Sequence, residues 1–235
     1  GAAVAEAFAA EGAKVAVNYR ASRKQAEALT ARLGGRTHAF QADVRRLDDV
    51  ERIVTEVAAL LGSPTTIVHN ALADFSFNGD ARSKLDVLSW SEMAAHFDTA
   101  VKGALNLVQT VRPAMAEARF GRIITIGTSL FQNPAVPYHD YTAAKAALLS
   151  LTRTAAAELG PSGSTVNMVS GGLLRTTDAS AATPDAIFDL VAAQTPLRRV
   201  VTPQELADAV LFFASPWARA VTGQNLIVDG GLVFS

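Results

Sequence analysis

Short runs rich in Val, Ile and Thr alternate along this chain with segments of helical periodicity, and this alternation limits the fold more than any other feature. Parallel strands need long crossover connections, which helices provide, so an alternating chain forms a parallel sheet with helices on both faces. We therefore predict an α/β fold with a doubly wound parallel sheet. The expected strands are 14–19, 37–43, 65–70, 121–127, 164–169 and 224–229, and the expected helices are 1–12, 22–35, 48–61, 89–118, 141–159 and a last one that begins at 202.

Two capping boxes mark where helices should begin. In such a box a Ser or Thr side chain accepts a bond from the backbone three residues later, while a Glu or Gln at that later position reaches back. Residues 22–25 have this pattern, and residues 202–205 add Pro203, which suits the first helical position. Residues 73–88 carry several charges and an Asn-Gly turn, so we expect a loop there.

The composition excludes several classes of function. The chain has 235 residues, with 21 Lys or Arg against 22 Asp or Glu, so it lacks the positive charge of a protein that binds nucleic acid or acidic membranes. It has no cysteine, which excludes disulfides and thiolate metal sites, and its four histidines are scattered, so we expect no metal site. It shows neither a run of about 18 apolar residues nor a signal-peptide pattern, and we expect one soluble cytoplasmic domain.

Tyr141 and Lys145 are the most informative pair, because they stand four residues apart in a predicted helix. At this spacing both side chains lie on one helix face, where the ammonium group can act on the phenol. A free phenol has a pKa of about 10, and a nearby positive charge favours the phenolate, so the pair could donate and accept a proton near neutral pH. The same spacing also occurs by chance on surface helices, so the neighbouring sequence is needed to tell a catalytic pair from a chance one.

Two hydroxyl groups supply that context. Thr128 and Ser129 follow the expected strand 121–127, at the end of a strand where α/β folds bind ligands. The order of a hydroxyl, twelve further residues, Tyr141, three residues and Lys145 resembles the catalytic signature of the short-chain dehydrogenase/reductase family. Other segments resemble family motifs in the same order, namely 1–15, 43–44, 69–72, 166–176 and 222–231.

This resemblance covers the whole chain and implies a fold, a chemistry and a set of site residues. It implies a single NAD(P)-binding Rossmann domain over 1–235, with a substrate lid at about 173–201, and hydride transfer between a nicotinamide dinucleotide and a carbonyl or alcohol. Tyr141 would protonate the carbonyl oxygen, Lys145 would lower the pKa of that tyrosine and hold the nicotinamide ribose, and Thr128 would hydrogen-bond the same oxygen. The residues that would also bind the cofactor are Gly1, Asp43, Val44, Asn70, Ala71, Gly172 and Thr176.

The end of the expected strand 14–19 bears on the choice of cofactor. An acidic residue there would bind the ribose 2′-hydroxyl and repel a 2′-phosphate, but this chain continues with Arg20 and Ser22. A guanidinium and a hydroxyl suit a phosphate, so we expect NADPH rather than NADH. The alternative is that Arg20 is only a solvent-exposed loop residue that does not bind the cofactor.

Several positions depart from the family pattern. Thr128 stands where the family usually has serine; it keeps the hydroxyl, and Ser129 could share its role. Ala100 replaces an asparagine that holds a water in the family's proton relay, so we expect slower or rerouted proton supply. Leu72 replaces a glycine near the cofactor, so its side chain must point elsewhere or reshape the pocket. Tyr138 has no lysine four residues later, so we expect it only to line or flank the site.

Three functional hypotheses follow. The first is an NADPH-dependent carbonyl reductase that resembles 3-oxoacyl-acyl-carrier-protein reductases and acts on a 3-oxoacyl thioester, either a small molecule or one bound to an acyl carrier. The second is an alcohol or sugar dehydrogenase of the same family. The third is a weakly catalytic dinucleotide-binding protein, which Ala100, Leu72 and the threonine in place of serine at Thr128 favour. Family members are commonly tetramers, so we expect a homotetramer, with no nucleic-acid or membrane partner.

The first residue raises a separate expectation. In the family, a central strand and the start of a glycine-rich loop come before the equivalent of Gly1, and this first strand is missing from the sequence. A parallel sheet without a central strand leaves buried backbone donors and acceptors unpaired on both neighbours. We expect roughly 10–20 further residues ahead of Gly1 in the natural chain, one strand plus a loop that binds the pyrophosphate. The intact mass would then exceed 24.6 kDa.

Overall fold

The computed structural model describes residues 1–75, 77 and 82–234, and its strands and helices alternate as the sequence predicts. The strands are β1 (Val15–Tyr19), β2 (Thr37–Gln41), β3 (Thr66–His69), β4 (Gly121–Thr128), β5 (Ser164–Gly171) and β6 (Asn225–Val228). The α-helices are α1 (Ala2–Ala10), α2 (Arg23–Leu33), α3 (Leu47–Leu61), α4 (Trp90–Phe97), α5 (Gly103–Ala118), α6 (His139–Leu159), α7 (Asp185–Gln194) and α8 (Pro203–Ala214). A π-helix, η2 (Asp98–Lys102), joins α4 to α5, and 3₁₀ helices form at η3 (Ser129–Phe131), η4 (Gly160–Ser162) and η5 (Pro216–Ala218).

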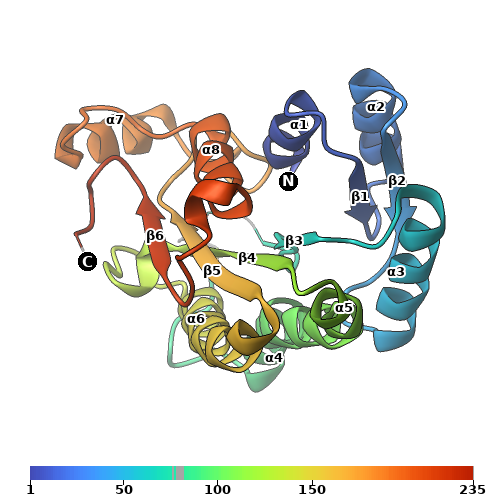
Figure 1. Ribbon diagram of the computed structural model, residues 1–235. Coiled ribbons are helices and arrows are strands. Elements are labelled where there is room, and N and C mark those ends of the chain that lie inside the picture. The colour runs from blue at the N-terminus through green and yellow to red at the C-terminus, as the bar shows by residue number, and fades with distance from the viewer. Residues whose placement is uncertain (76, 78–81, 235) are drawn as a thin grey trace.

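Every strand pair among the described residues is parallel, which confirms the predicted fold class, but the sheet is in two parts. β1 pairs with β2, and the remaining strands form a 4-stranded sheet in the order β3-β4-β5-β6. Within the described part of the chain no backbone ladder joins β1 to β3, and Figure 1 shows the two parts side by side.

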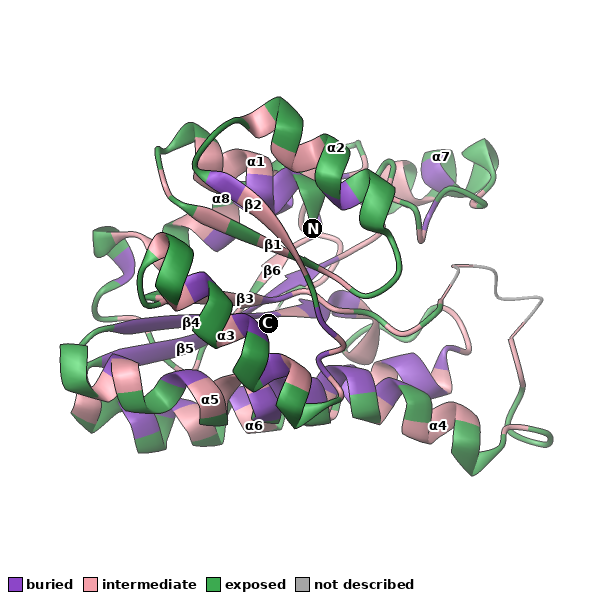
Figure 2. Cartoon of the chain, turned by 90° about the vertical axis from the view of Figure 1, so that its right-hand side faces the viewer, coloured by how far each residue is buried: buried purple, intermediate pink, exposed green. Residues whose placement is uncertain are grey.

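Helices cover both faces of the larger sheet. α1 and α8 pack together on one face, and α5 and α6 lie on the other, with α3 against α5 (Figure 1). The helix faces turned toward the sheet are buried and the outer faces are exposed, and β4 and β5 are the most deeply buried strands (Figure 2). None of the helices in the described ranges combines the length and the apolar character that a bilayer crossing requires.

Tertiary packing changes several local features that the sequence predicts. The single helix expected at 89–118 is divided into α4, η2 and α5, and the segment 173–201 contains the unpredicted helix α7. Ser22 is the N-cap of α2 but makes no side-chain capping bond, because its ψ of 51° differs from the extended backbone that a cap needs. The capping box predicted at 22–25 is therefore wrong, whereas both bonds of the box at 202–205 are present.

The parallel register brings the carboxyl ends of β3, β4 and β5 to one edge of the sheet. His69 pairs with Thr125, and Thr128, the last residue of β4, pairs with Gly171. The helix α6 contacts β4, β5 and η3, so its first turns meet these strand ends. Ligands of α/β folds bind at such an edge.

Candidate active site

Tyr141 and Lys145 lie in the first turns of α6 and are both buried, with 6% and 4% of their surfaces exposed. The Nζ atom of Lys145 lies 5.9 Å from the centre of the Tyr141 ring. The same Nζ donates a hydrogen bond of 2.6 Å to the carbonyl oxygen of Ile126 in β4. The helical spacing therefore places both groups on the helix face that packs against the sheet.

The hydroxyl group of Thr128 joins this pair. Thr128 is the N-cap of η3, and its Oγ1 accepts a bond of 3.3 Å from the backbone N–H of Leu130. The same hydroxyl hydrogen-bonds the Tyr141 phenol. Ser129 is also buried but lies beside Gly172, with its Oγ 3.7 Å from where a Cβ on that glycine would stand. The hydroxyl that contacts the phenol is therefore that of Thr128.

Burial sets the protonation of both titratable groups. Burial raises the pKa of Tyr141 to about 12, and the hydrogen bond with Thr128 offsets only part of this rise. Burial also lowers the pKa of Lys145 to about 8. Burial therefore moves the pKa of Tyr141 upward, whereas the sequence predicted a downward effect of Lys145, and that effect stays a prediction. The phenol therefore keeps its proton at neutral pH.

His69 lies behind this pair, and the sequence analysis did not single it out. Its Nε2 is 3.0 Å from the carbonyl oxygen of Ala100, which belongs to the π-helix η2. Burial, together with the charge of Lys145, lowers the pKa of His69 to about 4, so the imidazole is neutral at physiological pH. The ring fits against η2 because Gly103 has no side chain; a Cβ there would lie 3.2 Å from Cε1 of His69.

Aromatic side chains that the sequence analysis missed cover one face of Tyr141. Phe75 stacks on the Tyr141 ring with 4.7 Å between ring centres, and Phe77 meets the same ring edge-on at 5.9 Å. Tyr138, expected to line or flank the site, is buried, and its ring centre lies 5.3 Å from that of Phe75. The two phenylalanines belong to 73–88, where the charges and the Asn-Gly turn predicted a loop. The only sequence feature that could have indicated this contact is that the two phenylalanines stand two residues apart.

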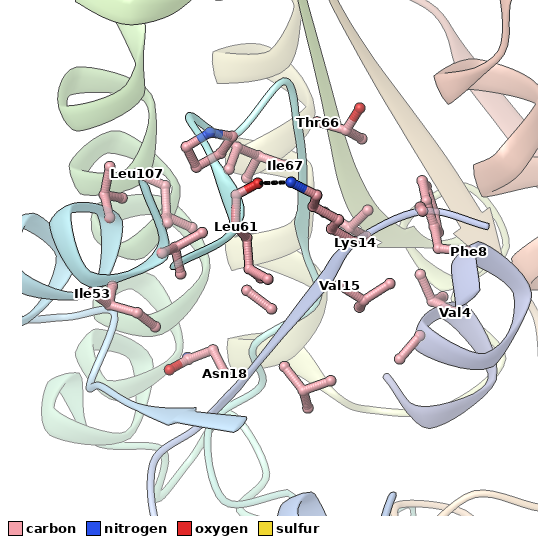
Figure 3. Close-up of a pocket in the computed structure, with 18 of the residues that line it drawn as sticks. Val4, Phe8, Lys14, Val15, Asn18, Ile53, Leu61, Thr66, Ile67 and Leu107 are labelled. Atoms are coloured by element: carbon pink, nitrogen blue, oxygen red, sulfur yellow. Dashed lines mark hydrogen bonds between the residues drawn. The ribbon is translucent and has the colours of Figure 1, made fainter. Parts of the chain in front are cut away.

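Part of the predicted cofactor-binding set lies along a cavity between β1 and β3 (Figure 3). The cavity has a volume of about 690 Å³ and is lined mainly by apolar side chains. At one of its walls Lys14 Nζ donates a bond of 2.8 Å to the carbonyl oxygen of Leu61. The group of Thr128, Tyr141 and Lys145 lies outside this cavity. The predicted cofactor residues along it are Gly1, Val44, Asn70 and Ala71.

The residues predicted to select the cofactor lie at the end of β1, among other charged groups. Arg20 donates to the Asp74 carboxylate at 2.8 Å in an exposed ion pair, and Ser22 is exposed at the start of α2. A hydrogen bond from Arg45 lowers the pKa of Asp43 to about 2, and the charge of Arg20 acts in the same direction. Arg20 and Asp43 therefore share one region of the structure.

The remaining predicted positions lie beyond β5 and β3. Gly172 occupies a place where no side chain fits, since a Cβ would lie 2.7 Å from the Cβ of Asp229. Thr176 is exposed at the start of the segment 173–201. Leu72 is 37% exposed, so the structure accommodates this departure from the family pattern at the surface.

A comparison with known protein families adds an independent observation. The family model described as enoyl-(acyl carrier protein) reductase matches residues 1–233. The chain belongs to the short-chain dehydrogenase/reductase family. This confirms the family inferred from the order of motifs. Membership of this family makes the protein an oxidoreductase that acts on carbonyl or hydroxyl groups with a nicotinamide dinucleotide.

Curated relatives match almost the whole chain. A "3-oxoacyl-[acyl-carrier-protein] reductase FabG" of Staphylococcus epidermidis is 35% identical over 236 residues, which cover 99% of this chain and 93% of the relative. A protein of the same name from Staphylococcus aureus is 32% identical over 235 residues, with the same coverage. "Oxidoreductase asL5" of Sarocladium schorii is 33% identical over 232 residues, covering 99% of this chain and 90% of the relative.

Proposed function

We propose that this protein is an NADPH-dependent reductase that reduces the ketone of a 3-oxoacyl thioester. The observation that carries the proposal is the buried phenol of Tyr141, which keeps its proton at neutral pH and contacts the Thr128 hydroxyl. A reductase needs a proton donor, so a phenol that stays protonated favours reduction over the oxidative direction of an alcohol or sugar dehydrogenase. The names of two curated relatives support a 3-oxoacyl substrate.

The chain's own residues carry out the proton transfer of this reaction. When bound, the reduced nicotinamide supplies a hydride for the carbonyl carbon. The hydroxyls of Thr128 and Tyr141 hydrogen-bond the carbonyl oxygen, and Tyr141 donates its proton as negative charge develops on that oxygen. Lys145, when charged, stabilises the phenolate that remains and would hold the nicotinamide ribose. The product is a 3-hydroxyacyl thioester.

The residues at the end of β1 fit the 2′-phosphate of NADPH. Arg20 offers a guanidinium and Ser22 a hydroxyl, both exposed. Arg20 must leave Asp74, but an exposed ion pair contributes at most about 1 kcal/mol. A hydrogen bond to a charged group contributes about 1.5–3 kcal/mol, so the exchange favours the phosphate. The residues that would contact the rest of the cofactor are Gly1, Asp43, Val44, Asn70, Ala71, Gly172 and Thr176.

The proposal includes an acyl-carrier-bound substrate, a homotetramer and a cytoplasmic location. Apolar side chains near the C-terminus support a subunit contact, because Leu226 is 39% and Phe234 is 86% exposed. Native mass spectrometry would test the tetramer, and cell fractionation would test the location. A comparison of the same acyl group on an acyl carrier protein and on coenzyme A would test the carrier.

A second candidate is the reduction of an enoyl thioester, which the description of the matching family names. The deciding experiment follows NADPH absorbance with acetoacetyl and crotonyl thioesters, for the wild type and for Tyr141→Phe. Turnover of the acetoacetyl thioester that disappears in Tyr141→Phe supports the proposal. Turnover of the crotonyl thioester alone favours the second candidate. Binding of NADPH without turnover of any carbonyl in a broad panel favours a dinucleotide-binding protein.

A further inference from the structure

The catalytic tyrosine lies in a cluster of aromatic rings that the proton-transfer chemistry does not use. Phe75 stacks on Tyr141 at 4.7 Å with only 20° between the ring planes. Phe77 and Tyr138 meet Phe75 edge-on, at 5.0 and 5.3 Å between ring centres. Tyr138 and Tyr141 are buried, whereas the two phenylalanines are only half-buried. The half-buried rings therefore present apolar surface next to the catalytic phenol.

Charged groups hold Phe75 in this place. The Arg82 guanidinium lies 4.7 Å from the centre of the Phe75 ring and forms an ion pair with Asp140. The side chain of Asp140 is 3% exposed, so its charge needs this partner, and His96 lies 3.5 Å from the same carboxylate. Asp140 also accepts a bond of 2.8 Å from the backbone N–H of Tyr141. The cation that contacts Phe75 is thus anchored one residue from the catalytic tyrosine.

A backbone contact ties the same rings to the segment expected to cover the substrate. The N–H of Phe77 donates a bond of 2.9 Å to the carbonyl oxygen of Ala179, which lies in 173–201. Phe77 therefore contacts both the ring of Tyr141 and that segment. A substituent on a carbonyl bound at Tyr141 can reach these rings.

We propose that Phe75 is a specificity-determining residue that selects carbonyl substrates with an aromatic substituent next to the reacting carbon. The inference rests on the proposed function and names a narrower substrate class for it. Tyr141 stacks on the Phe75 ring and the Arg82 guanidinium lies over it, so a substrate meets only the exposed edges of Phe75 and Phe77. An aromatic substituent can contact these edges, whereas a short alkyl group makes few of these contacts. A polyhydroxylated substituent would lose hydrogen bonds to water against this apolar surface. One aromatic pair contributes up to about tenfold in binding.

The test compares two thioesters that differ only at the reacting ketone, the acetoacetyl and the benzoylacetyl esters of N-acetylcysteamine. For the wild type we expect kcat/KM to favour the benzoylacetyl ester by about tenfold. Phe75→Leu keeps an apolar side chain but removes the ring, so this ratio should fall most of the way to one, mainly through the KM of the aromatic substrate. Phe75→Tyr keeps the ring and should keep the ratio. Phe120→Leu is the matched control, because Phe120 lies at the opposite end of β4.

The outcomes separate this inference from the proposed function. Turnover of both esters without a preference in the wild type overturns the role of Phe75 and leaves the proposed function standing. A preference that survives in Phe75→Leu also overturns it. No turnover of either ester defeats the proposed function and this inference with it.

Discussion

The imidazole of His69 and the carbonyl oxygen of Ala100 lie 3.0 Å apart in a buried contact between the end of β3 and the π-helix η2. Ala100 has no polar side chain, and the sequence therefore predicted slower or rerouted proton supply. In the structure the backbone carbonyl of Ala100 has a polar partner, the ring of His69. Among the described residues, Nδ1 of His69 has no hydrogen-bond partner, so protonation of the ring would place an unpaired charge in the core.

The buried state of His69 predicts a loss of stability in mild acid. Its pKa is lowered from 6.5 to about 4, so between these values the unfolded chain binds the proton and the folded protein does not. The free energy of unfolding should therefore fall as pH drops from 6.5 toward 4, by roughly 3 kcal/mol from this group. Urea unfolding of the wild type and His69→Gln at several pH values measures the difference. His38→Gln is the control, and an equal pH slope in His69→Gln and the wild type would contradict the prediction.

Replacement of Tyr141 should abolish most of the activity. Tyr141→Phe removes the proton donor but keeps the buried ring and its stack with Phe75. We expect kcat to fall by about 10²–10⁴-fold while NADPH still binds. Tyr138→Phe removes a hydroxyl from a neighbouring buried ring and should retain most of the activity. Comparable losses of kcat in the two variants would show that Tyr141 is not the specific proton donor.

Arg20 should control the choice between the two cofactors. Arg20→Ala removes the guanidinium expected to bind the 2′-phosphate, so kcat/KM for NADPH should fall by about 10–100-fold while that for NADH changes little. Arg36→Ala, an exposed arginine before the start of β2, should change neither value. The prediction fails if both cofactors lose kcat/KM equally in Arg20→Ala.

Gly103 should be intolerant of even the smallest side chain. A Cβ there would lie 2.8 Å from Cγ2 of Val44 and 3.2 Å from Cε1 of His69, so Gly103→Ala should lower the free energy of unfolding by about 1–3 kcal/mol. Gly35→Ala is the matched control, because nothing lies within 4 Å of a Cβ at that position. Thermal or urea unfolding of both variants gives the comparison. If Gly103→Ala were as stable as the wild type, the surrounding core would have adjusted to the added methyl group and the prediction would be wrong.

The sequence by itself determined what depends on neighbours along the chain. The helical period alone places Tyr141 and Lys145 on one face of α6, and the alternation of strand and helix patterns predicts the parallel pairing. The capping box at 202–205 forms as predicted, because both of its partners lie within one helical turn. The family also follows from the order of short motifs, each of which is local.

Only the tertiary structure decided what depends on residues far apart in sequence. The pairing of Arg20 with Asp74 joins positions 54 residues apart, and the stack of Phe75 on Tyr141 joins a loop to a helix. No sequence period relates such residues. The pKa of Tyr141 likewise depends on how completely its neighbours exclude water, and this burial raises it to about 12. The helix spacing thus follows from local geometry, whereas the environment that tunes the phenol exists only once the chain is packed.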